Sequence, residues 1–197
     1  MDEALALLAD LRRRYPHNPL FLQAAAEIHD VYRHDAPASL DAWRRLLNLA
    51  RARRVSLPEE SEARARVGMA EALDDLYQTD YALEQLRIVT ESSPASPYGL
   101  AARAWLLLGE AHDRLGGREA AVAAYRAAMA AAPRDDPDRV KSRASEALRR
   151  RPDPRAAEAY RRSLEGWRHL QRGELDPAAE ALSRAAALNP ADPVLRY

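Results

Sequence analysis

The stretch 101–133 constrains the fold of this chain more than any other. Trp105, Leu108 and His112 fall at i, i+3 and i+7, which places them on one stripe of a helix. The glycines within 115–117 break that helix, and a second apolar stripe follows. We therefore expect two antiparallel helices joined by a tight turn, a pair that cannot bury its apolar face without neighbours.

The full spacing is W-x2-L-G-x2-H, then Ala121-x3-Tyr125, then Pro133. It resembles the tetratricopeptide repeat (TPR), with His112 and Tyr125 in the places of two aromatics. Gly109 lies inside the first helix, where glycine costs about 1 kcal/mol relative to alanine, so we expect it to admit a close neighbour. The resemblance implies a right-handed solenoid of antiparallel helix pairs.

The same pattern recurs in other parts of the chain, with a small residue in each first helix and another in each second helix. The first-helix residues are Ala26, Ala70, Gly109 and Gly166, and the second-helix residues are Ala38, Ala82, Ala121 and Ala178. The distance in sequence between successive repeats is uneven, so some helices or linkers must contain extra residues. We expect the second helix that begins at Ala38 to run to about Arg54, and an unpaired helix from about Asp136 to Arg151.

The expected fold is all-α, a TPR-like solenoid of roughly ten helices forming a single array over 1–197. Its segments are a half-repeat at 1–17, repeats at 19–57, 61–97, 98–133 and 154–190, an inserted helix at 134–153, and the start of a further helix at 191–197. Both ends resemble half units, so we expect the chain to come from a longer array in a larger bacterial protein.

Composition narrows the classes of function. The net charge is zero, so nucleic-acid binding is not expected. The chain has no cysteine, which excludes disulfides and thiolate metal sites, and no apolar run is long enough for a membrane span. The compartment stays open: the cytoplasm is slightly favoured over a periplasmic or membrane-tethered parent protein.

Charged residues recur at equivalent places in the first helices. Glutamates follow the small residue, aspartates come three residues later on the same helix face, and arginines lie seven residues before two of the glutamates. They are Glu27, Glu71 and Glu110, Asp30, Asp74 and Asp113, and Arg64 and Arg103. In TPR proteins this face lines the concave groove, which implies an acidic ladder for a partner segment bearing Lys or Arg. The alternative is a solvated face that keeps the array soluble.

The last repeat departs from this ladder. Trp167 and Leu170 stand where the other repeats have acids, and Tyr160 lies seven residues before Trp167 on the same face. These aromatics are either groove anchors for a partner or a packing surface for the inserted helix at 136–151. We leave the two alternatives open.

No motif assembles a catalytic site, a cofactor site or a metal site, so none of these is predicted. His29, His112 and His169 recur at one position, but neighbouring repeats place them on the order of 10 Å apart, too far for one ion. Arginines gather near helix ends, as at 149–151, where they suit the helix dipole. Binding of an anionic surface would require them on one face.

We therefore expect a non-catalytic scaffold that binds a protein or peptide in the groove. The groove residues are Glu27, Asp30, Arg64, Glu71, Asp74, Arg103, Glu110, Asp113, Tyr160 and Trp167. The alternative is a structural segment of a larger protein that self-associates through its solenoid ends.

Overall fold

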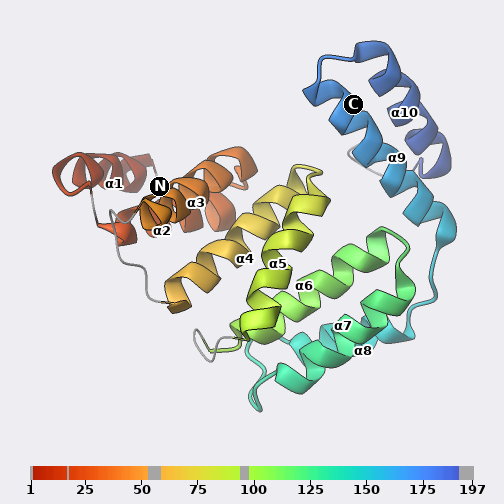
Figure 1. The fold of residues 1–197 in the computed structure, drawn as a ribbon, viewed down its shortest axis with the longest axis horizontal. Coiled ribbons are helices and arrows are strands. Elements are labelled where there is room, and N and C mark those ends of the chain that lie inside the picture. The colour runs from red at the N-terminus through yellow and green to blue at the C-terminus, as the bar shows by residue number, and fades with distance from the viewer. Residues whose placement is uncertain (1, 17, 53–58, 94–97, 191–197) are drawn as a thin grey trace. The chain divides into compact units, whose positions relative to one another are not determined.

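The computed structural model describes residues 2–16, 18–52, 59–93 and 98–190, and over these residues it contains helices and no strands (Figure 1). The α-helices are α1 (Asp2–Arg14), α2 (Pro19–Glu27), α3 (Ala36–Arg51), α4 (Glu59–Asp75), α5 (Thr79–Ser92), α6 (Leu100–Arg114), α7 (Arg118–Ala131), α8 (Val140–Arg149), α9 (Pro154–Gln171) and α10 (Leu175–Leu188). A π-helical turn, η1 (Ile28–Tyr32), continues α2. The expectation of an all-α fold with roughly ten helices is confirmed.

The chain divides into two compact units, Met1–Ala104 and Trp105–Tyr197, with the boundary inside α6. In the first unit α1 packs on α2, α2 on α3, α3 on α4 and α4 on α5, and α2 also contacts α4. In the second unit α7 packs on α8, and α9 packs on α10. In a helical-repeat solenoid, each helix packs on its neighbours in the chain in this way.

The turns between paired helices share one backbone design. In three pairs, an amide just before the second helix donates to the carbonyl five residues earlier. These bonds run from Gln78 to Leu73, from Gly117 to His112 and from Glu174 to His169, at 2.8, 2.8 and 2.9 Å. The residue before each donor has a positive φ, which reverses the chain; these residues are Tyr77, Gly116 and Gly173. The repeat in the sequence therefore has a counterpart in the backbone.

The first pair contains one extra residue in this turn. The amide of Asp35 donates to the carbonyl of His29, six residues earlier, at 2.9 Å. The π-helical turn η1 accommodates the extra residue because a π-helix closes its hydrogen bonds over one more residue than an α-helix. Ser39, at 0% exposure, therefore takes the buried position that alanine holds in the other pairs. Ala38, which we expected there, is only half-buried.

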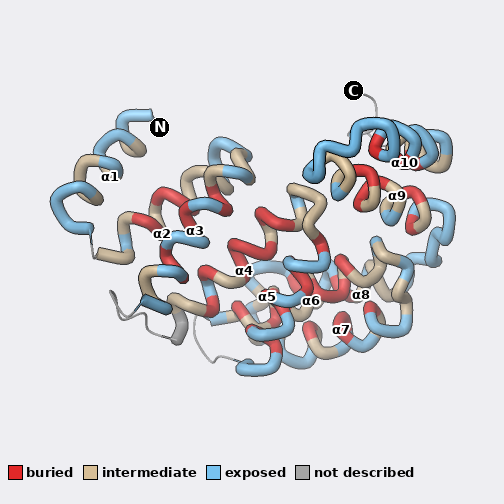
Figure 2. Tube along the Cα trace, turned by 45° about the horizontal axis from the view of Figure 1, so that its top comes forward, coloured by how far each residue is buried: buried red, intermediate tan, exposed pale blue. Residues whose placement is uncertain are grey.

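Buried residues line the facing sides of paired helices in each unit (Figure 2). In the first unit Trp43 of α3 is 3% exposed, and a methyl group at Gly68 of α4 would lie 2.5 Å from its ring. In the second unit a methyl group at Gly109 of α6 would lie 2.6 Å from the ring of Tyr125 on α7. The close neighbour expected at Gly109 is therefore an aromatic ring, and the small residue is needed for packing.

The inserted helix is shorter than expected. The Asp136 carboxylate accepts hydrogen bonds from the amides of Val140 and Lys141, at 2.7 and 3.0 Å, and Arg139 has a φ of 54°. The chain therefore forms a turn over 136–139 before α8 begins. The segment 191–197, expected to start another helix, lies outside the described residues. No helix in the described part of the chain is long and apolar enough to cross a membrane.

Candidate functional site

In the first unit, ion pairs connect successive first helices on the predicted face. Arg64 of α4 donates to Glu27 of α2 at 3.0 Å. Arg103 of α6 donates to Glu71 of α4 through Nη2 at 2.5 Å and through Nε at 3.2 Å. Each arginine therefore reaches back to the glutamate of the preceding first helix, and the glutamates of this face are compensated within the chain.

Asp30 and Glu71 are the carboxylates that burial affects most on this face. Burial raises the pKa of Asp30 above its ordinary value, against the opposing charges of Arg103 and His34. Burial also raises the pKa of Glu71; Arg103 opposes this rise, and the charge of Asp30 adds to it. Arg103 is thus the positive charge that both carboxylates share. A second cation between them would favour their ionised forms.

Asp74 and Asp113 brace their own helix pairs. The Thr79 hydroxyl donates to Asp74 at 3.0 Å, and Arg118 donates to Asp113 at 2.8 Å, each across five residues from the end of a first helix to the start of a second. The Tyr125 hydroxyl also donates to Asp113, at 3.1 Å. Burial and this neighbouring carboxylate raise the pKa of Tyr125. We predicted that these two aspartates contact a partner in the groove. Their hydrogen bonds within the helix pairs show that they also have a structural role.

In the second unit, α8 continues the series of ion pairs. Arg143 of α8 donates to Glu110 of α6 at 2.8 Å, the same backward contact that Arg103 makes with Glu71. The inserted helix therefore occupies the place of a first helix with respect to this contact. Seven residues after Arg143, where the other first helices carry their glutamate, the chain has Arg150, the residue that caps the end of α8. The helix ends before it could offer the next acid.

Tyr160 and Trp167 both lie on α9, the helix that packs on α10. The guanidinium of Arg114 lies 5.6 Å from the centre of the Tyr160 ring, within the range of a cation–π contact. Both aromatic side chains are half-buried. Their role as partner anchors stays a prediction.

The contact between Arg118 and the end of α8 could not be predicted from the sequence. Arg118 donates through Nη2 to the carbonyls of Ala147, Leu148 and Arg150, at 3.1, 2.9 and 3.1 Å. These carbonyls lie at the end of α8, where an α-helix leaves its last carbonyls without i+4 amide partners; that of Ala147 also accepts from the amide of Arg150 at 3.2 Å. The donor and its acceptors are 29–32 residues apart, so no local pattern connects them.

The described residues contain no group of three or more His, Asp or Glu side chains that could hold a metal ion. His29 faces Asp35 at 3.7 Å, and His169 contacts Glu174 at 2.5 Å, so each has a carboxylate of its own helix pair nearby.

No protein-family model matches this chain, and no curated protein matches it. The resemblance to tetratricopeptide repeats therefore depends on the residues quoted above.

Proposed function

We propose that this chain is a non-catalytic, TPR-like scaffold that binds a protein or peptide segment on the face of its first helices. The observation that carries the proposal is the cluster of Asp30, Glu71 and Arg103 in the first unit. It joins side chains from three successive first-helix segments on one face. Residues 41 and 32 positions apart meet there because the repeats stack, as recognition surfaces of solenoids do.

The cluster favours a partner that brings a positive charge. Burial raises the pKa of both carboxylates, and Arg103, which opposes both rises, already pairs with Glu71, so a further positive charge would stabilise the ionised form of Asp30. A Lys or Arg side chain of the partner would supply the missing charge and form charge-assisted hydrogen bonds. Tyr160 and Trp167 belong to the second unit, where they would be apolar anchors for a segment bound to that unit, of the kind that dominate binding energy at protein interfaces.

The test is a selection of random peptides on the full chain, followed by affinity measurements with variants. We expect the selected peptides to carry Lys or Arg, and Asp30→Asn to weaken their binding about tenfold, the effect of losing one charge-assisted contact. Glu84→Gln on α5 is the matched control, because Glu84 is exposed on a second helix. Selected peptides without basic residues that bind all three proteins equally would refute the proposal.

The second candidate is a structural segment that self-associates. It is favoured by the pairing of Glu27, Glu71 and Glu110 with arginines of the chain itself, which makes an external partner unnecessary for charge balance. Sedimentation velocity over a range of concentrations separates the two. Assembly that is unchanged in Asp30→Asn, without saturable peptide binding, supports self-association.

A further inference from the structure

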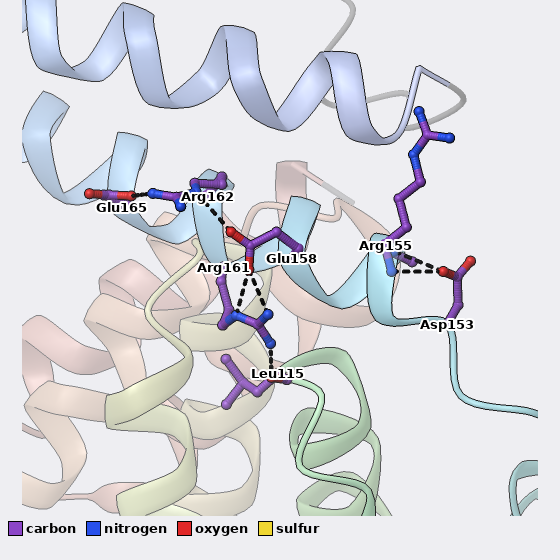
Figure 3. Close-up of polar contacts among 8 residues, drawn as sticks. Leu115, Asp153, Arg155, Glu158, Arg161, Arg162 and Glu165 are labelled. Carbon is purple, nitrogen blue, oxygen red and sulfur yellow. Dashed lines mark hydrogen bonds and ion pairs between the residues drawn. The ribbon is translucent and has the colours of Figure 1, made fainter.

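The second unit contains a cleft of about 510 Å³ beside the first half of α9. Four segments line it: the end of α6 with the α6–α7 turn near Gly116, the α8–α9 linker at 150–153, the first turns of α9, and Asn189 after α10. Arg161 of α9 donates to the carbonyl of Leu115 at 2.7 Å, which joins α9 to the α6–α7 turn (Figure 3). A cavity of this volume is in the range that holds small ligands.

The lining is rich in arginine. Its charged residues are Arg114, Arg118, Arg150, Arg151, Arg161, Asp113 and Asp153. Asp113 is compensated by Arg118 at 2.8 Å, and one oxygen of Asp153 accepts from the amides of Arg155 and Ala156 at the start of α9. The arginines of the lining therefore outnumber its acids by three.

Internal contacts hold some of these arginines and leave others available. Glu158 accepts from Arg161 at 2.6 Å and lies outside the lining, so it orients that guanidinium and offsets part of its charge (Figure 3). Among the residues that the structure describes, the Arg150 side chain pairs with Glu146 alone, at 3.4 Å; both side chains are exposed, and such pairs contribute little. Arg151 has no hydrogen bond or ion pair with any residue that the structure describes.

We propose that this cleft binds the phosphate monoester group of a ligand. A monoester carries a charge of about −1.5 to −2 near pH 7, which matches the surplus of arginines. The planar fork of a guanidinium fits two phosphate oxygens at once. Arg150 and Arg151 line the cleft from the linker, and Arg114, whose guanidinium lies 5.6 Å from the centre of the Tyr160 ring, lines it from the end of α6. The half-buried Tyr160 ring, also in the lining, gives the organic part of the ester an apolar surface.

The experiment is a calorimetric titration of the full chain with phenyl phosphate at constant ionic strength, with phenol as the uncharged control. We expect saturable binding of phenyl phosphate and none of phenol. Arg151→Gln should weaken binding about tenfold, as expected for a charged hydrogen bond. Arg149→Gln is the matched control. It removes the same charge two residues away, outside the lining, so its effect should be about twofold or less.

Two results would overturn the proposal: no saturable binding by the wild-type chain, or equal weakening by Arg149→Gln and Arg151→Gln, which indicates diffuse attraction. Amide shifts in an NMR titration provide a second measurement, and they should concentrate near Gly116 and Arg151. A phosphoserine peptide, titrated in parallel, identifies the carrier of the phosphate. Tighter binding than phenyl phosphate assigns a phosphorylated segment, and equal or weaker binding assigns a small ester. This site does not depend on the protein-binding face of the first unit, so either proposal can fail alone.

Discussion

At the scale of single residues, the turn between paired helices imposes the strictest requirement. The residue before the closing amide has φ values of 51°, 55°, 83° and 75° in the four pairs, at His34, Tyr77, Gly116 and Gly173. Side chains other than glycine adopt this left-handed region at a cost of about 1–2 kcal/mol. Two pairs avoid this cost with glycine, and two carry it.

Gly173→Ala measures that cost in isolation. A methyl group at Gly173 would meet nothing within 4 Å, so only backbone strain remains, and we expect a loss of about 1–2 kcal/mol in the free energy of unfolding by urea. Gly117→Ala is the control. Gly117 has a φ of −80°, and its nearest contact would be 3.4 Å away, so a change of about 0.5 kcal/mol or less is expected. Equal losses in both variants would contradict the assignment of strain.

At the scale of helices, a repeated contact joins α4 to α2, α6 to α4 and α8 to α6: an arginine of the later helix donates to a glutamate 32–37 residues earlier. The sequence predicted that these residues share a face, because their spacing within each helix is regular. It did not predict that they pair with each other, because that pairing depends on how far successive helices are offset. The same limit hid the role of α8, which lacks the small residue and glutamate of the other first helices but keeps the arginine.

Glu71→Gln should change how stability depends on pH. Because burial raises the pKa of Glu71 in the folded state, the folded chain binds the proton of the Glu71 carboxyl group more tightly than the unfolded chain does. The resulting stabilisation is present below the ordinary pKa of 4.5 and is lost as the pH rises through the raised value. Relative to Glu71→Gln, the wild type should therefore lose stability from about pH 4 upward. Urea unfolding of both proteins across that range tests this, and a difference in stability that does not change with pH would contradict it.

Arg118 links two elements, so its loss should be felt in both. Arg118→Ala removes the side-chain donor of the carbonyls at the end of α8 and the charged donor of the half-buried Asp113, which keeps the Tyr125 hydroxyl. We expect unfolding to become easier by about 2 kcal/mol and the amides of α8 to exchange faster. Arg126→Ala removes an exposed arginine from the same helix and should change stability by less than about 0.5 kcal/mol. Similar losses in the two variants would show that the capping contact contributes little.

At the scale of the molecule, helix content followed from composition and periodicity, since helix formation depends on residues close in the chain, but α8, which we expected to be unpaired, packs on α7. Features that depend on distant residues did not follow, as the cleft near Gly116 shows. The arginines of 149–151 were predicted to lie at a helix end, but the place of Arg150 and Arg151 in the cleft lining depends on where α9 begins. The π-helical turn of the first pair was also missed, because its sequence differs from the other turns only by one added residue.

Stability should also vary along the array in proportion to burial. α1 has no buried residue, whereas α5 has seven, so opening α1 exposes little apolar surface. We expect the amides of α1 to exchange with solvent much faster than those of α5 in a native-state hydrogen-exchange experiment. Leu8→Ala in α1 should cost less than about 1 kcal/mol, while Leu86→Ala in α5, at 2% exposure, should cost about 2–5 kcal/mol. Equal protection of the two helices would show that a partner or a neighbouring copy covers α1 in solution.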